Sequence, residues 1–211
     1  MFDYSIDSPP RPTCRLVLAH GAGAGKDSEF MQQISALLVA RGIEVVRFNF
    51  AYMQTIERTG KRRPPEKAGV LLQHFTGLLE HLEHQLPALP LWLGGKSMGG
   101  RMATMLVDQT SALGAVAYGY PFHPPGKPDK LRTEHLVQAG KPVHIFQGER
   151  DTFGIPDEVN HYELHSKVTL HWLEDGDHSL KPRKKSGYDY QQHLQRTAED
   201  TARLLNTGTA Q

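Results

Sequence analysis

The five residues 95–99, Gly-Lys-Ser-Met-Gly, match the pattern G-x-S-x-G. This pattern presents a serine on a sharp turn between a strand and a helix. The apolar stretch "LPLWL" precedes it, and methionines at helical spacing follow it. Small residues on both sides keep the serine hydroxyl clear of the neighbouring backbone. The stretch therefore predicts that Ser97 is a nucleophile.

The same stretch contains Gly-Lys-Ser, which also ends a phosphate-binding loop. Such a loop has the pattern G-x-x-x-x-G-K-[ST] and would need a glycine at position 90. Pro90 stands there instead, inside the predicted strand. Because proline has no amide hydrogen and a fixed φ, it cannot take the place of that glycine. The sequence thus argues against a nucleotide-binding NTPase.

A serine hydroxyl becomes a good nucleophile when a histidine accepts its proton and a carboxylate orients that histidine. His178 follows the apolar run "VTLHWLE", and Asp151 follows "PVHIFQG". If both runs are parallel strands, these side chains emerge at the same sheet edge as Ser97. Other carboxylates nearby in sequence are Glu149, Asp175 and Asp177.

Six short apolar runs read as strands that are covered on both faces: "CRLVLAHG", "IEVVRFNF", "LPLWLGG", "GAVAYGY", "PVHIFQG" and "VTLHWLE". Apolar stripes with helical spacing lie between or after them, over 30–38, 71–82, 98–106 and 194–205. This alternation predicts an α/β fold: a doubly wound, mostly parallel sheet of six or seven strands with helices on both faces.

Composition limits the remaining possibilities. The 211 residues predict a single domain, 1–211, with a frayed tail at about 207–211. A net charge of +1 does not favour nucleic-acid binding. The single cysteine, Cys14, and the absence of a signal-like or membrane-spanning stretch predict a cytoplasmic protein. We expect a monomer or homodimer that needs no metal and no organic cofactor.

The chain resembles the α/β-hydrolase superfamily from "LVLAHGAGAG" to "DGDHSL". It is most similar to the small, lidless branch near dienelactone hydrolases. That branch includes bacterial predicted hydrolases and the hydrolase-like domains of a human NSL-complex subunit and a testis-expressed protein. The closer likeness lies in "AHGAGAG", "RFNFAYM", "GGKSMGGRMA" and "YPFHPPGKPDKLRTEHL". The resemblance implies a triad of Ser97, Asp151 and His178, and an oxyanion hole formed by the amides of Met98 and Ala22.

Two further features concern the substrate. Three basic segments, 58–67, 123–132 and 178–185, each follow a predicted strand, so they would surround the site and attract anions. Arg62 and Arg63 represent this surface, although solvated loops are often charged without a binding role. Only a short segment separates "AYGYPF" from "KPVHIF", which predicts an open cleft without a cap. Its expected walls are Tyr120, Phe122 and His123.

These features predict a serine hydrolase that acts on ester or thioester bonds of small soluble substrates, anionic ones among them, through an acyl-enzyme. Two alternatives stay open. One is a catalytically idle hydrolase-like module that binds partners. The other is a peptidase or amidase with the same triad, which motifs cannot separate from an esterase.

Overall fold

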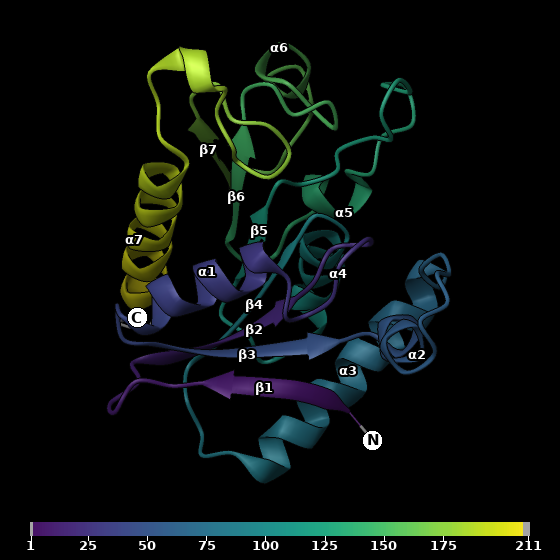
Figure 1. The fold of residues 1–211 in the computed structure, drawn as a ribbon, viewed down its shortest axis with the longest axis vertical. Coiled ribbons are helices and arrows are strands. Elements are labelled where there is room, and N and C mark those ends of the chain that lie inside the picture. The colour runs from purple at the N-terminus through teal and green to yellow at the C-terminus, as the bar shows by residue number, and fades with distance from the viewer. Residues whose placement is uncertain (1, 209–211) are drawn as a thin grey trace.

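The computed structural model describes residues 2–208, and its centre is one seven-stranded sheet (Figure 1). The strands are β1 (Asp3–Asp7), β2 (Cys14–Ala19), β3 (Ile43–Asn49), β4 (Leu91–Lys96), β5 (Ala115–Tyr118), β6 (Val143–Gly148) and β7 (Val168–Leu173). Their spatial order is β1-β3-β2-β4-β5-β6-β7, and only β1 is antiparallel to its neighbour. The carboxyl ends of β2 to β7 therefore share one edge of the sheet. This is the predicted mostly parallel α/β architecture.

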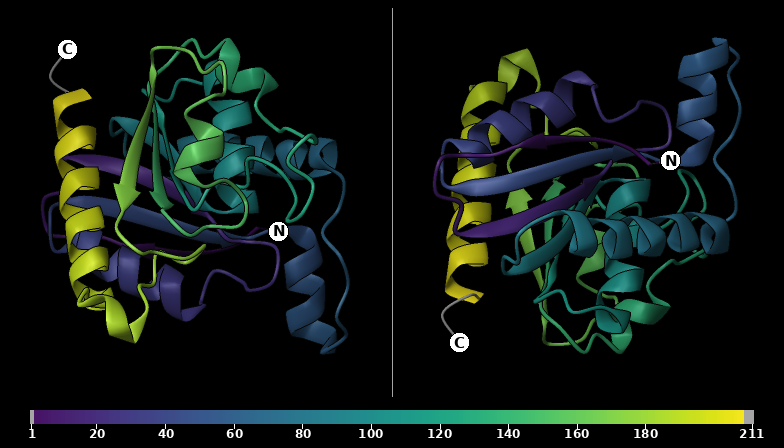
Figure 2. Two further views of the ribbon diagram at one scale, coloured as in Figure 1. Left: turned by 90° about the horizontal axis from the view of Figure 1, so that it is seen from above. Right: turned by 90° about the horizontal axis from the view of Figure 1, so that it is seen from below.

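Helices cover both faces of the sheet (Figure 2). They are α1 (Glu29–Val39), α2 (Ala51–Thr59), α3 (Ala68–Gln85), α4 (Met98–Leu106), α5 (Glu134–Val137), α6 (Pro156–Val159) and α7 (Tyr190–Gly208). Helices α1 and α7 lie on one face, and α3 and α4 lie on the other. The four predicted helical stripes correspond to these four helices.

Strand β2 shows why the central strands read as continuous apolar runs. All six of its residues are buried. Leu16 and Leu18 pack into the core beneath α1 and α7, whereas Val17 and Ala19 pack into the core beneath α3 and α4. Since neighbouring side chains of a strand point to opposite faces, a sheet with two covered faces favours apolar residues at successive positions, and the buried Arg15 of β2 is paired with Glu44.

Strand β1 and helix α2 were not among the elements identified from the sequence. The sequence of β1 is "DYSID", which is too polar to read as a buried strand, and Ile6 is 39% exposed. The strand is held at the sheet edge by its backbone ladder with β3 and by polar side chains. Asp7 accepts a hydrogen bond from Arg47 of β3 at 2.9 Å. An edge strand of this kind needs little apolar surface.

The segment between β5 and β6 contains one short helix, α5, and no inserted domain. Within residues 2–208 no cap covers the carboxyl edge of the sheet. This agrees with the short spacing between the two strands in the sequence.

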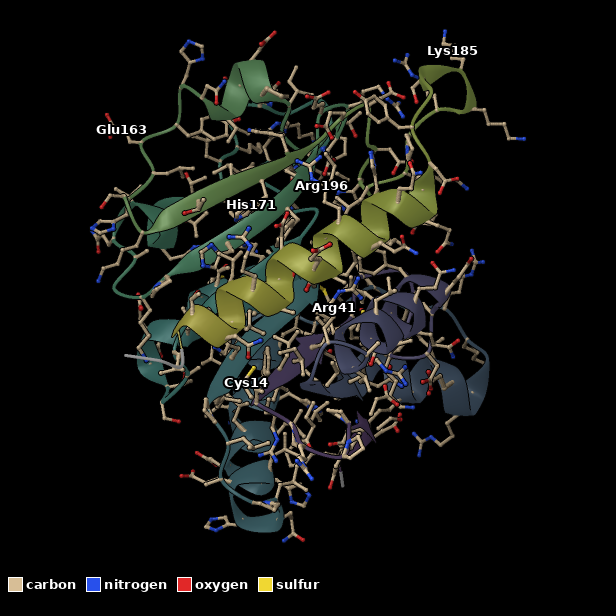
Figure 3. All side chains as sticks on the ribbon, turned by 90° about the vertical axis from the view of Figure 1, so that its left-hand side faces the viewer. Cys14, Arg41, Glu163, His171, Lys185 and Arg196 are labelled. Carbon is tan, nitrogen blue, oxygen red and sulfur yellow. The ribbon has the colours of Figure 1, made fainter. Side chains whose placement is uncertain are left out.

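The end of the chain is partly described. Thr207 and Gly208 belong to α7, so the predicted frayed tail does not begin at 207, and residues 209–211 lie outside the described residues. Cys14, labelled in Figure 3, is buried at the start of β2. None of the helices over 2–208 is both long and apolar enough to cross a bilayer. The cytoplasmic location, the single-domain assignment and the oligomeric state stay predictions.

Candidate active site

Ser97 stands at the turn between β4 and α4 in a strained backbone conformation. Its φ is 52° and its ψ is −114°, which non-glycine residues rarely adopt. Its N–H donates to the carbonyl of Tyr118 on the neighbouring strand at 3.0 Å, which holds the turn against the sheet. The side chain therefore projects from the carboxyl edge, as the G-x-S-x-G pattern predicts.

The glycines around Ser97 are required by close backbone contacts. A Cβ on Gly95 would overlap the backbone of Gly99, and a Cβ on Gly99 would overlap the carbonyl of Ala19 in β2. A Cβ on Gly100 would lie 2.7 Å from the carbonyl oxygen of Gly95. Helix α4 can thus approach β2 and β4 only because these positions lack side chains.

His178 and Asp151 complete a chain of hydrogen bonds that begins at Ser97. The Oγ of Ser97 lies 2.8 Å from Nε2 of His178, and Nδ1 of His178 lies 2.7 Å from Oδ2 of Asp151. Asp151 follows β6 and His178 follows β7, so three separate strands bring these groups to one edge. The structure therefore brings together the three side chains that the sequence singled out.

The carboxylate of Asp151 is fully buried and is held on both oxygens. Oδ2 also accepts a hydrogen bond from the Gln147 side chain at 2.8 Å, and Oδ1 accepts one from the Phe153 amide at 2.9 Å. These donors keep the carboxylate aimed at the imidazole, because a buried charge needs hydrogen bonds to replace its water.

The alternative carboxylates have other partners. Glu149 accepts the amide hydrogen of Asp175, Asp175 forms ion pairs with Arg150 and Arg183, and Asp177 accepts the amide hydrogens of Ser179 and Lys181. All three order the loops around the site and do not contact the imidazole ring. The side chain of Arg183 lowers the pKa of Asp175 far below its usual value through a hydrogen bond.

The loop that carries His178 is fixed by Lys96, the residue before Ser97. The ammonium group of Lys96 donates a hydrogen bond to the backbone carbonyl of His178. Gly119, with a φ of 65°, lets the same carbonyl approach the end of β5, where a Cβ would overlap it. The ring of Phe153 stacks on the imidazole at 4.2 Å between centroids. Backbone and ring of His178 are thus held from different sides.

Lys96 itself lies in a largely buried environment, with its ammonium group 5.6 Å from the centre of the Phe30 ring. Burial lowers its pKa from 10.5 to about 8, and the nearby charges of Asp151 and Asp177 act in the opposite direction. The lysine that makes the stretch resemble a phosphate-binding loop is therefore a contact between the serine turn and the histidine loop.

The loop after β2 contains Ala22, whose amide is the predicted second oxyanion donor. His20 anchors this loop: its Nδ1 lies 2.6 Å from the Gly21 carbonyl, and its Nε2 accepts the Phe50 amide hydrogen at 3.1 Å. A neutral ring with its proton on Nδ1 satisfies both bonds. Burial lowers the pKa of His20 to about 4, which keeps the ring neutral at pH 7. The Tyr52 hydroxyl donates to the Ala22 carbonyl at 3.0 Å.

Ala22, Ser97 and Met98 line a common cavity of about 280 Å³. The other lining residues are Pro65, Glu66, Ala68, Leu71, Arg101, Met102, Pro121, Arg132 and Phe153. The predicted oxyanion donors are therefore on the wall beside the serine. Among residues 2–208, no cluster of His, Cys, Asp and Glu side chains is arranged to hold a metal ion.

The residues that we expected to contact the substrate do not line the cavity that contains Ser97. Tyr120, Phe122 and His123 are buried in the core and do not line this cavity. The Tyr120 hydroxyl donates to the Arg132 carbonyl at 2.7 Å, which ties the loop that contains Arg132 to the core. Arg62 and Arg63 are exposed beyond the cavity rim. The wall next to the serine is formed instead by Met98, Pro121 and Phe153.

Two arginines that the sequence reasoning did not single out lie on that wall, Arg101 and Arg132. Arg101 is four residues after Ser97, and its amide donates to the Ser97 carbonyl at 3.0 Å. Residues four apart share a helix face, so the spacing alone could have indicated Arg101. Arg132 ends the basic segment 123–132 that the sequence places at this edge, but its position on the cavity wall depends on the path of the loop after β5.

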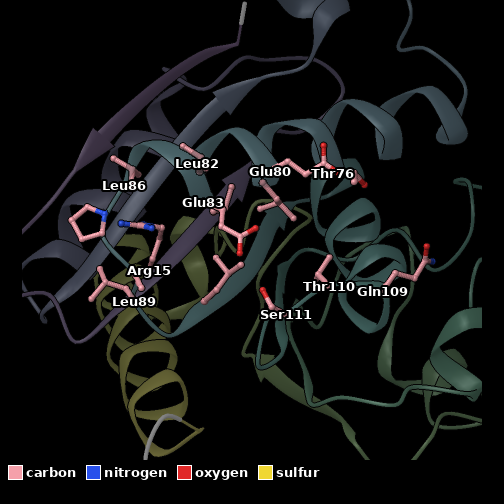
Figure 4. Close-up of a pocket in the computed structure, with 15 residues that line it drawn as sticks. Arg15, Thr76, Glu80, Leu82, Glu83, Leu86, Leu89, Gln109, Thr110 and Ser111 are labelled. Atoms are coloured by element: carbon pink, nitrogen blue, oxygen red, sulfur yellow. The ribbon is translucent and has the colours of Figure 1, made fainter.

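A larger cavity of about 480 Å³ lies at the opposite edge of the sheet (Figure 4). It is bounded by the end of α3 and by the segments that precede β4 and β5. Leu82, Leu86 and Leu89 form much of its apolar wall. Neither Ser97 nor His178 nor Asp151 reaches it.

A parallel sheet with a strained serine turn at its carboxyl edge defines the α/β-hydrolase class. The family model of the alpha/beta hydrolase domain matches residues 12–206, and the chain belongs to this family. It is a hydrolytic enzyme of the alpha/beta hydrolase family. No curated protein matches the chain by sequence.

Solved structures share the fold at low sequence identity. An alpha-beta serine hydrolase homologue from Coxiella burnetii is 16% identical, with 97% of this chain and 89% of that chain covered and a TM-score of 0.71. Dienelactone hydrolase from Anabaena variabilis is 17% identical, with 95% and 88% covered and a TM-score of 0.69. A lidless serine hydrolase from Xanthomonas campestris is 19% identical, with 99% and 88% covered and a TM-score of 0.65.

Proposed function

We propose that this protein is a serine esterase or thioesterase that acts on small soluble substrates through an acyl-enzyme. The observation that carries the proposal is the unbroken hydrogen-bond chain from Ser97 through His178 to Asp151 beside an open cavity. Esterases are also among the structures that share this fold, such as Est1E from Butyrivibrio proteoclasticus.

In the proposed first step, Ser97 Oγ attacks the carbonyl carbon while Nε2 of His178 accepts the hydroxyl proton. Asp151 keeps the proton of the imidazole on Nδ1 and stabilises the charged ring. The amides of Met98 and Ala22 bind the oxyanion of the tetrahedral intermediate, where one donor typically contributes about 3–4 kcal/mol. His178 then donates its proton to the departing alcohol or thiol, which leaves an ester between Ser97 and the acyl group.

The second step reverses these roles. His178 removes a proton from a water molecule, the water attacks the acyl carbonyl, and Ser97 Oγ departs with the proton from His178. Because no cap covers the carboxyl edge within residues 2–208, both substrate and water reach Ser97 from solvent. His20 and Tyr52 support this chemistry by holding the loop that carries Ala22.

The test is a series of p-nitrophenyl and thiophenyl acyl esters of increasing chain length, with Ser97→Ala as the control. We expect turnover by the native protein, loss of turnover in the variant, and covalent labelling of Ser97 by a fluorophosphonate. If no ester is turned over and Ser97 is not labelled, a partner-binding module becomes the better description. Faster cleavage of matched anilides than of esters would identify an amidase.

A further inference from the structure

Two guanidinium groups lie on the wall of the cavity that contains Ser97. Arg101 comes from the first turns of α4, and Arg132 comes from the loop between β5 and α5. Both side chains are partly exposed to the cavity. They thus enter the same small volume from different elements, close to where a bound acyl or alcohol group would lie.

These arginines differ from the other shielded arginines of the molecule. Arg15 pairs with Glu44 at 2.5 Å, and Arg47 pairs with Asp7 and Asp27, both at 2.9 Å. Within residues 2–208, neither Arg101 nor Arg132 makes an ion pair, and the buried Nε of Arg101 has no hydrogen-bond partner. A partly buried guanidinium without a counter-charge is costly, and an anion bound in the cavity would offset that cost.

The two charges also act on each other. Burial and, to a smaller extent, the nearby charge of Arg101 lower the pKa of Arg132, so the cation of Arg132 is disfavoured where it stands. Glu66 is the one carboxylate among the lining residues, and it contacts neither guanidinium within ion-pair distance. Glu66 Oε2 is also buried without a hydrogen-bond partner. Two guanidinium groups against one carboxylate nevertheless leave the lining with a net positive charge.

We infer that Arg101 and Arg132 form a carboxylate-binding subsite, and that the substrate is an ester or thioester whose acyl or alcohol part carries a carboxylate. A guanidinium offers parallel N–H donors that match the two oxygens of a carboxylate. The apolar remainder of the wall, Met98, Pro121 and Phe153, suits the hydrocarbon that joins the carboxylate to the reacting carbonyl. This inference rests on the proposed function for its reaction and extends it to the substrate class.

The kinetic experiment uses two pairs of esters that differ in one charge. The first pair is 4-carboxyphenyl butyrate and 4-carbamoylphenyl butyrate, and the second is the p-nitrophenyl ester of adipic acid and that of its monoamide. We expect kcat/KM to favour the carboxylate at least about tenfold in one pair, mainly through KM. Arg101→Gln and Arg132→Gln should each reduce this preference to about threefold or less, as measured by the ratio of kcat/KM for the two members of a pair within one variant.

Arg62→Gln is the matched control, because Arg62 is exposed on the same edge but does not line the cavity. If the subsite is local, Arg62→Gln should keep the preference for the carboxylate substrate. Addition of 0.5 M salt should then weaken this preference only modestly. If Arg62→Gln removes the preference as fully as Arg101→Gln does, the effect is long-range steering and the subsite is disproved. Arg101→Lys, which keeps the charge but not the two-pronged donor, should retain part of the preference and guards against misfolding.

A binding experiment separates this inference from the proposed function. Calorimetry on Ser97→Ala, which does not depend on catalysis, should detect 4-hydroxybenzoate or the monoamide of adipic acid, and Arg101→Gln in that background should weaken binding about tenfold. Binding that depends on the arginines, without turnover of any ester, would reject the esterase and keep the subsite. Turnover of the neutral esters, with neither carboxylate preference nor carboxylate binding, would reject the subsite and keep the esterase.

Discussion

Two cavities lie at opposite edges of the same sheet, each between helices and strands, and they differ in size, in lining residues and in the pairing of their charged groups. The larger one, at the amino edge, is bounded largely by leucines and by the chain segments that lead into β4 and β5. Its buried arginine, Arg15, is neutralised by Glu44. The smaller one, at the carboxyl edge, contains Ser97 and the unpaired guanidinium groups of Arg101 and Arg132.

Backbone strain also differs between the carboxyl edge and the amino edge of the sheet. Among residues 2–208, the non-glycine residues with positive φ are Ser97, Asp175 and Leu180. All three follow strands at the carboxyl edge, and none borders the larger cavity. Strained turns are retained where they aim a functional group, and they cost about 1–3 kcal/mol each. Cavity volume therefore does not point to the proposed active site, whereas backbone strain lies at the edge of the sheet that carries it.

The largest expected effect distinguishes the two cavities by removing one serine hydroxyl from each. Ser97→Ala should reduce kcat for an activated ester by at least about a thousandfold, because it removes the nucleophile. Ser111→Ala, which removes an exposed hydroxyl from the larger cavity, should leave kcat within about twofold. Steady-state kinetics on the same ester compare them, and equal losses in both variants would contradict the assignment.

The next effect concerns the buried carboxylate. Asp151→Asn should reduce kcat by roughly a thousandfold or more, since an amide no longer holds the Nδ1 proton of His178 or stabilises its charged form. Asp157→Asn, an exposed change on α6, should have no measurable effect. The unfolding transitions of both variants, measured by circular dichroism, must match the native one for the comparison to hold.

Close packing of the serine turn predicts a large effect on stability. Gly99→Ala places a methyl group on the Ala19 carbonyl and should lower the free energy of unfolding by about 3–5 kcal/mol. Gly69→Ala, in the first turn of α3 with no atom within 4 Å of the new methyl group, should raise it by up to about 1 kcal/mol. Urea denaturation measures both, and similar small changes would mean that α4 is not tightly docked.

The lysine beside the nucleophile predicts a pH dependence. Burial holds the folded-state pKa of Lys96 at about 8, below its ordinary value of 10.5, so the unfolded chain binds the proton more tightly between these two pH values. The contribution of Lys96 to the free energy of unfolding should therefore rise from pH 8 to pH 10.5, by on the order of 3 kcal/mol. The difference in stability between the native protein and Lys96→Met, measured by denaturation at each pH, should show this rise. A flat difference would mean that the lysine is well solvated.

The smallest expected effect tests the strain directly. Ser97→Gly removes the side chain from a backbone conformation with a φ of 52° and should raise the free energy of unfolding by about 1 kcal/mol relative to Ser97→Ala. Both variants lack the nucleophile, so only stability differs between them. Thermal denaturation followed by calorimetry provides the comparison, and a less stable glycine variant would argue against strain at this turn.

Much of the architecture could be predicted because it follows from local patterns. Strands β2 to β7 are mostly apolar runs with few polar residues, and α1, α3, α4 and α7 carry stripes at helical spacing. The position of Ser97 follows from glycines that no other residue could replace. Strand β1 escaped this reasoning, since it is stabilised by hydrogen bonds and ion pairs to β3 rather than by apolar burial.

Contacts between distant segments explain what the sequence could not indicate. Tyr120 and Phe122 look like exposed walls of a cleft when read along the chain, but the path of the loop after β5 turns them into the core. The basic residues Arg62 and Arg63 are prominent in the sequence, yet Arg101 and Arg132 reach the cavity. Whether a side chain faces solvent, core or site depends on which loops meet at the sheet edge.

The fold class, the serine turn and the candidate triad residues could be predicted from the sequence alone. Strand burial, helix spacing and the steric limits on glycine act over a few residues, so local patterns reveal them. The tertiary structure decided the rest. It selected Asp151 from four neighbouring carboxylates, turned Lys96 toward the histidine loop and placed two unpaired guanidinium groups beside Ser97. These outcomes depend on distances between segments far apart in the chain, which no local pattern encodes.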